Sequence, residues 1–96
     1  MRRAVVLVVM AGLLSIPAAA SASVTKFDFD NVAFPDGTTG VIYASVKDNH
    51  NNSNTYCEFA TESGEFLGYY QEPEVVFAQP DQVEQFCLDH FGDRQT

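Results

Sequence analysis

Two histidines are the side chains of this sequence best suited to proton transfer or to binding a transition metal. His50 lies among asparagine and aspartate residues, and His90 directly follows Asp89. A lone imidazole without a second ligand at a suitable spacing binds metals weakly. Neighbours along a helix point about 100° apart, so Asp89 is not expected to orient His90. The sequence therefore predicts no catalytic histidine, no metal site and no cofactor.

Carboxylates are numerous, with 13 Asp and Glu residues. Asp28 and Asp30 would share a strand face, as would Glu58 and Glu62, and a glycosidase uses such a pair as acid and base. That chemistry needs a walled cleft, for which a chain of 96 residues has little volume. Spacings typical of a catalytic triad, a phosphate-binding loop or a zinc site are absent from the sequence. We interpret the chain as non-enzymatic, with a small secreted hydrolase or cation-dependent enzyme as the alternative.

A polar segment from Asp48 to Asn54 carries oxygen-bearing side chains that could surround Ca²⁺. It lacks the glycine and glutamate that an EF-hand loop requires. Asparagine tolerates left-handed backbone angles, so an exposed hairpin loop is the favoured interpretation. Asn51-Asn52-Ser53 also matches an N-glycosylation acceptor, which matters only in a eukaryote, whereas the start of the chain looks bacterial.

The first residues are typical of a secretory signal peptide. Met1-Arg2-Arg3 is cationic, residues 4–16 are apolar or small, and Pro17 precedes a run of Ala and Ser. A basic start, a short apolar run and an A-x-A site match a cleaved leader. We expect cleavage after Ala22, with Ala20 as the alternative. Residues 1–22 would be removed, and residues 23–96 would form one small secreted, extracellular domain.

Export would also make the chain more acidic. The full chain has a formal net charge of -8. Removal of Arg2 and Arg3 leaves three cations, Lys26, Lys47 and Arg94, against 13 carboxylates, so the mature net charge is -10. Such a surface repels phosphate backbones, so nucleic acid and anionic membranes are excluded as partners. An extracellular protein with a basic surface is permitted, and so is the simpler role of keeping a monomer soluble.

The cysteines, Cys57 and Cys87, both lie in the predicted mature domain. Two cysteines in a short exported chain favour one intramolecular disulfide. The bridge would close a loop of about 31 residues and stabilise the domain by roughly 3 to 4 kcal/mol in the chain-entropy model.

Alternating apolar and polar residues predict a sheet in the first part of the mature chain. The expected strands are residues 24–30, 41–47, 55–61 and 66–70, with a fifth possible at 75–77. The apolar phase shifts near Asn31, which predicts a bulge or break there, and Gly68 marks a second bulge or a close approach. Short turns between successive strands indicate an antiparallel meander.

A helix is predicted at the end of the chain, because apolar residues recur there at helical spacing. These residues are Val83, Phe86, Cys87 and Phe91. Asp81 is the expected N-cap, Glu84 would complete a capping box, and Gly92 would end the helix. The predicted fold is α+β: a small antiparallel meander of four to five strands packed against one C-terminal helix, with one disulfide pinning the helix across the sheet.

The tyrosines are the one feature that favours binding. Aromatic residues at adjacent positions in the run 66–70 must point to both faces of a strand. With Tyr43 and Tyr56 on neighbouring strands, Tyr69 or Tyr70 would complete an exposed patch. Its expected rim is Glu58, Glu72 and Glu74. The alternative is that a loop or the first strand covers this face.

These patterns favour a non-catalytic protein-binding module, either an inhibitor or an interaction factor. It would use the four tyrosines or the segment from Asp48 to Asn54. A structural envelope or matrix component is a further alternative, which self-association would distinguish from a monomeric binder.

Overall fold

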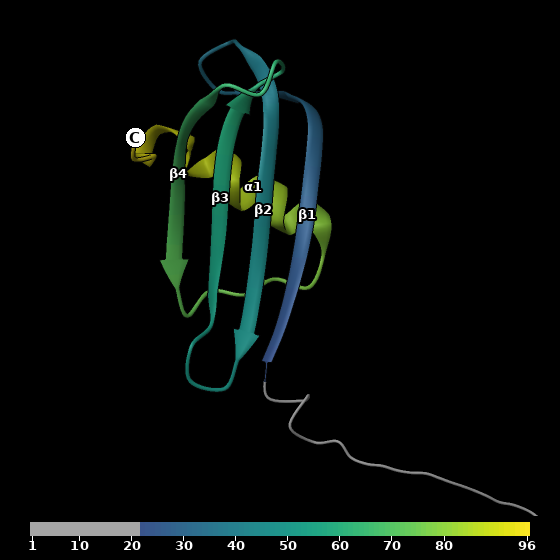
Figure 1. Cartoon of the computed structure of the whole chain (residues 1–96), viewed down its shortest axis with the longest axis vertical. Coiled ribbons are helices and arrows are strands. Elements are labelled where there is room, and N and C mark those ends of the chain that lie inside the picture. The colour runs from purple at the N-terminus through teal and green to yellow at the C-terminus, as the bar shows by residue number, and fades with distance from the viewer. Residues whose placement is uncertain (1–21) are drawn as a thin grey trace, which may run out of the picture.

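Alternation of apolar and polar side chains builds a four-stranded sheet. The computed structural model describes residues 22–96, and the predicted signal peptide, 1–22, therefore lies outside the described residues except for Ala22. The strands are β1 (Ala22–Ala33), β2 (Thr39–Asn49), β3 (Asn54–Thr61) and β4 (Phe66–Pro73). They lie in the order β1-β2-β3-β4, and each neighbouring pair is antiparallel (Figure 1). The predicted meander is confirmed.

The possible fifth strand at residues 75–77 is not formed. Glu74 adopts a φ of 66°, which turns the chain away from β4. Its amide donates to the Ser53 carbonyl at 2.7 Å, and the Thr55 hydroxyl donates to the Val75 carbonyl at 2.7 Å. The Glu74 amide and the Val75 carbonyl are thus bonded to residues at the start of β3 and not to a further strand. The segment instead crosses the sheet toward β1, with Phe77 packed against the core.

Both predicted irregularities are present. The β1–β2 register shifts between Phe29 and Val32, where Asn31 has a φ of 56°. Gly68 has a φ of 132°, and the β3–β4 register shifts beside it. A Cβ at Gly68 would lie 2.8 Å from the Gln95 carbonyl oxygen, so a glycine is required at this close approach.

The helix α1 (Pro80–Asp89) begins two residues earlier than a cap at Asp81 requires. Gln79 is the N-cap and makes no side-chain capping bond, so the predicted capping box of Asp81 and Glu84 is wrong. Proline suits the first helical turn, because its φ is fixed and it has no N–H to satisfy. Pro80 therefore starts the helix and moves Asp81 inside the first turn. The helix ends at Asp89, before Gly92, and a short 3₁₀ helix, η3 (Phe91–Asp93), follows.

The hydrophobic core lies between the sheet and α1, which crosses behind the sheet in Figure 1. We call the side of the sheet that contacts α1 the inner face and the opposite side the outer face. The core centres on three rings: Phe34 and Phe91 stack at 4.6 Å, and Phe59 meets Phe91 edge-on at 5.1 Å. The buried core residues are Val32, Phe34, Ile42, Ala44, Val46, Cys57, Phe59, Val83, Cys87 and Phe91.

The predicted disulfide is present. Cys57 in β3 and Cys87 in α1 are bonded, with their Cα atoms 5.7 Å apart, and both are fully buried. The bridge ties the helix to the middle of the sheet, as expected. The fold is therefore a two-layer α+β domain with one disulfide.

The end of the chain closes one edge of the sheet. The Tyr69 amide donates to the Gln95 carbonyl at 2.8 Å, and the Gln95 amide donates to the Tyr69 carbonyl at 2.7 Å. Arg94 donates from Nε to the Leu67 carbonyl at 2.9 Å, and its guanidinium lies 4.1 Å from the centre of the Phe91 ring. The Arg94 side chain is thus held against β4. None of the helices within residues 22–96 is long and apolar enough to cross a bilayer.

Candidate functional site

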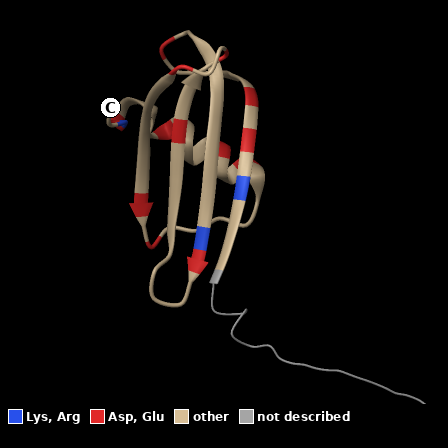
Figure 2. Cartoon of the chain, in the orientation of Figure 1, with Lys and Arg blue, Asp and Glu red and all other residues tan. Residues whose placement is uncertain are grey.

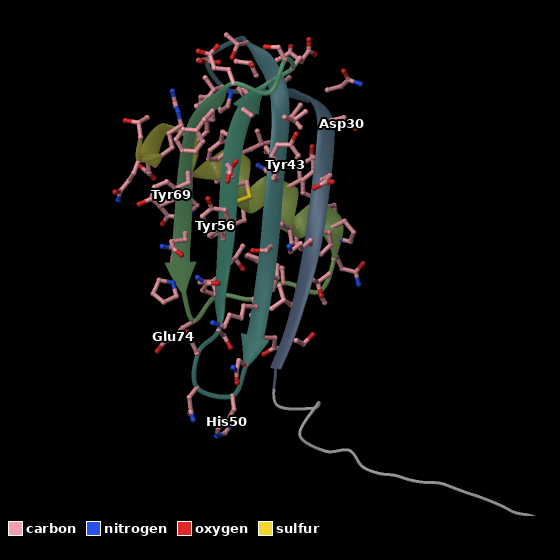
Figure 3. The ribbon with its side chains drawn as sticks, in the orientation of Figure 1. Asp30, Tyr43, His50, Tyr56, Tyr69 and Glu74 are labelled. Atoms are coloured by element: carbon pink, nitrogen blue, oxygen red, sulfur yellow. A yellow bond between two sulfur atoms is a disulfide. The ribbon has the colours of Figure 1, made fainter. Side chains whose placement is uncertain are left out.

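The outer face carries three of the four tyrosines, Tyr43, Tyr56 and Tyr69. They come from β2, β3 and β4, and Figure 3 shows them on the face turned away from α1. Their neighbours in sequence, Ala44, Cys57 and Tyr70, point to the inner face, as side chains in a strand must alternate. Tyr43 is 43% exposed, and Tyr56 and Tyr69 are half-buried. Three of the four predicted tyrosines therefore share the outer face, but only Tyr43 is exposed.

Four of the outer-face residues form one row across the sheet. Asp28 pairs with Tyr43, Tyr43 pairs with Glu58, and Glu58 pairs with Tyr69. Directly opposed side chains on neighbouring antiparallel strands have Cβ atoms about 4.5 to 5.5 Å apart. We call Asp28, Tyr43, Glu58 and Tyr69 the acid–tyrosine row. Acids and tyrosines alternate along it, so the Glu58 carboxylate is flanked by a tyrosine on each side.

Tyr56 also lies on the outer face of β3, two residues before Glu58. Its hydroxyl donates to Glu58 Oε1 at 3.0 Å, and its ring stacks on Tyr69 with centroids 5.9 Å apart. Partial burial raises the pKa of the Tyr56 hydroxyl above 10.0, and the hydrogen bond to Glu58 raises the pKa further. The hydroxyl therefore stays protonated at neutral pH and remains a donor. Glu58 is held through Oε1, and within residues 22–96 its Oε2 accepts no hydrogen bond from a side chain.

The acids of the row have no cationic partner. Among the residues that the structure describes, no Lys or Arg forms a salt bridge with a carboxylate, and the one histidine–carboxylate contact joins His90 to Asp93. Beside the row is a hollow of about 340 Å³, lined by Lys26, Asp28, Tyr43, Ala44, Ser45 and Tyr56. Lys26 shares this hollow with Asp28 but is not bonded to either acid. Glu58, half-buried among three tyrosines, is thus an unpaired negative charge on an aromatic surface.

Tyr70 does not belong to the patch. It pairs with the buried Cys57 and so lies on the inner face, where its ring stacks on His90 at 4.2 Å. Its hydroxyl donates to Glu72 Oε1 at 2.7 Å, and this bond, with some desolvation, raises the pKa of Tyr70. The expected patch is therefore corrected to Tyr43, Tyr56 and Tyr69. The expected rim changes too: Glu58 lies inside the patch, and Glu72 faces the other side.

The two histidines lie in different parts of the fold. His50 is exposed at the tip of the β2–β3 hairpin, where Figure 3 shows it at the far end of the sheet from Asp30. His90 follows α1, with its Nδ1 3.3 Å from Asp93 Oδ2 and its ring against Tyr70 and Phe86. Asp93, rather than the sequence neighbour Asp89, is the carboxylate beside His90. No group of three or more metal-ligating side chains occurs within residues 22–96.

The hairpin loop is shorter than the predicted segment from Asp48 to Asn54. Strand β2 continues to Asn49 and β3 begins at Asn54. The Ser53 hydroxyl accepts from the Asn49 amide at 3.3 Å and donates to the Asn49 carbonyl at 2.9 Å. This side chain closes the loop and lets the strands extend into the polar segment. Among the proposed carboxylate pairs, Glu62 lies in the turn after β3, beyond the strand that holds Glu58.

The acid–tyrosine row is the feature that sequence reasoning missed. Alternation places Asp28, Tyr43 and Glu58 on one face, but only the strand register brings them into a line. Comparison with known proteins finds no matching family model, no matching curated protein and no matching solved structure. The geometry of the outer face is therefore the basis for inferring a function.

Proposed function

We propose that this chain is an exported, non-catalytic protein-binding module, an inhibitor or interaction factor, that docks a partner protein on its outer face. The observation that carries the proposal is the contrast between the two faces of the sheet. The inner face is closed by a disulfide-tethered helix, whereas the outer face carries the exposed Tyr43 and the half-buried Tyr56 and Tyr69 around the Glu58 carboxylate. A contiguous aromatic patch, unlike single scattered rings, is a common mark of an interaction site.

The residue types support a protein partner. Tyrosine is enriched in interfaces because a rigid ring supplies contact area and its hydroxyl supplies a hydrogen bond. Phe66, 51% exposed, lies on the same face, opposite Ala60. The excess of acids favours a partner with a basic surface and opposes nucleic acid and self-association. A monomeric extracellular binder fits these features better than a matrix component does.

Export is supported by two independent features. The predicted leader, residues 1–22, gives a route out of the cytoplasm, and the buried disulfide suits an oxidising compartment. A bacterial source agrees with the composition of that leader.

The test is affinity capture from extracellular fractions with the oxidised protein as bait. The Tyr43→Thr/Tyr69→Thr variant removes two rings of the row and keeps strand propensity, because threonine favours strands. We expect the variant to lose the captured protein while its unfolding free energy changes by less than about 1 kcal/mol.

The matched control is His50→Ala/Asn52→Ala, which alters the hairpin tip and leaves the outer face intact. Capture by this control should equal that of the wild type. Equal capture by the wild type and the tyrosine variant would refute the outer face as the docking surface. Loss of capture only in the loop variant would move the binding site to the hairpin, and capture of the chain by itself would support a structural component.

A further inference from the structure

We propose that the acid–tyrosine row is a seat for an arginine side chain that a basic partner protein inserts between Tyr43 and Tyr69, onto the carboxylate of Glu58. This inference rests on the proposed function and names the chemical group that the outer face recognises. The juxtaposition that carries it is an unpaired, half-buried carboxylate with one tyrosine directly opposite it on each neighbouring strand.

The geometry suits a planar cation. A guanidinium donates several N–H bonds in its own plane and presents its two faces to aromatic rings. With Tyr43 on one side of Glu58 and Tyr69 on the other, such a group finds ring surfaces and an acceptor at one place. Cation–π contact and a charge-assisted hydrogen bond then act on the same group. A lysine ammonium offers no flat faces and is more strongly hydrated, so we expect it to bind less well.

Tyr56 prepares the carboxylate for this contact. Its hydroxyl holds Glu58 Oε1 at 3.0 Å, and its ring is stacked on Tyr69. Two elements of the seat are therefore ordered before any partner arrives, which lowers the entropic cost of binding. Glu58 Oε2 remains available as the acceptor for the incoming cation.

The charge of the outer face favours an arginine-bearing partner over a second copy of this chain. Figure 2 shows acids on β1 and β3 and in the turns beyond them, and further acids at the opposite ends of β2 and β4, with few lysines between them. The acids in the row and toward the turns beyond it are Asp28, Asp30, Asp36, Glu58, Glu62 and Glu65, and those toward the opposite end are Asp48, Glu72 and Glu74. Two copies docked through this face would bring like charges together, whereas a basic segment meets complementary charge along the whole row.

The test is a titration of the oxidised protein with a nine-residue peptide of alternating arginine and threonine, followed by NMR of the tyrosine rings. The reference is the same peptide with citrulline in place of arginine, which keeps the shape and removes the charge. We expect the arginine peptide to bind at least about tenfold more tightly and to shift the Tyr43, Tyr56 and Tyr69 signals. The corresponding lysine peptide should bind more weakly than the arginine peptide.

Two charge-matched variants separate the seat from general attraction. Glu58→Gln should weaken arginine-peptide binding about tenfold. Asp89→Asn removes the same charge from the exposed side of α1 and should change the affinity less than about twofold. Equal binding of the arginine and citrulline peptides, or equal weakening by both variants, would overturn the proposal. Shifts at the three tyrosines that depend on protein concentration, without peptide, would assign the face to a second copy and would also overturn it.

The result is distinguishable from failure of the proposed function. If the arginine peptide does not bind but the Tyr43→Thr/Tyr69→Thr variant still loses its captured partner, the outer face docks a protein by other chemistry. If capture does not depend on the tyrosines and the arginine peptide does not bind, both proposals fail.

Discussion

Removal of the disulfide in a Cys57→Ala/Cys87→Ala variant is expected to lower the free energy of unfolding by about 3 to 4 kcal/mol. The bridge spans a sequence separation of 30 residues and joins β3 to α1, so its loss frees a long loop in the unfolded chain. Both cysteines are fully buried, and their replacement also leaves a small void beneath the helix. A domain of this size has only a few kcal/mol of stability in total, so we expect the variant to be largely unfolded at 37 °C. Urea denaturation followed by circular dichroism measures the change.

Reduction supplies the control for this variant. Addition of a thiol reductant should destabilise the wild type by a similar amount and leave the variant unchanged. Oxidised and reduced wild-type protein with the same denaturation midpoint would contradict the structural role assigned to the bridge.

Truncation of the central ring, Phe59→Ala, is expected to cost about 3 to 5 kcal/mol of unfolding free energy. Phe59 is fully buried on β3 and meets both Phe34 and Phe91 edge-on, at 6.0 and 5.1 Å. Truncation of Phe59 removes its ring contacts to Phe34 and, in η3, to Phe91. Thermal unfolding monitored by near-UV circular dichroism follows this change.

Phe66→Ala is the matched control for the core. The same truncation at an exposed ring of the outer face should cost less than about 1 kcal/mol. Similar losses for Phe59→Ala and Phe66→Ala would mean that the outer face is as closely packed as the inner one, and the assignment of the two faces would be wrong.

Local sequence patterns predict the layers of this fold well. Ile42, Ala44 and Val46 alternate with polar or aromatic residues and do lie in the core, because the sheet has one dry and one solvent-facing side. The disulfide follows from the presence of only two cysteines. The helix start is harder to predict, since Asp81 and Pro80 both favour a helix N-terminus and the proline determines which residue begins it.

Strand register is the part that local patterns do not contain. A hairpin closed between Lys47 and Tyr56 would keep the two faces of each strand but place Tyr43 opposite Ala60. In the structure Lys47 pairs with Asn54, so Tyr43 lies opposite Glu58. This register depends on the tight loop that the Ser53 hydroxyl closes against Asn49. One side chain at the hairpin therefore helps to set the acid–tyrosine row at the middle of the sheet.

Local patterns also fail to predict which aromatic residues of β4 face outward. Adjacent positions must face opposite ways, but alternation alone leaves open whether Tyr69 or Tyr70 faces outward. The bulge at Gly68 and the pairing of Tyr70 with Cys57 decide that Tyr69 faces outward. A residue near the end of the chain, Gln95, closes this strand edge, and no local signal in β4 anticipates that contact.

Chemical modification of tyrosines tests most directly whether the outer face is the binding surface. Nitration of the oxidised wild-type protein, read by mass spectrometry, compares each tyrosine with and without the arginine peptide. The account predicts that the peptide protects Tyr43 and Tyr69 and leaves the reactivity of Tyr70 unchanged. Protection of Tyr70 with unchanged reactivity at Tyr43 and Tyr69 would contradict it.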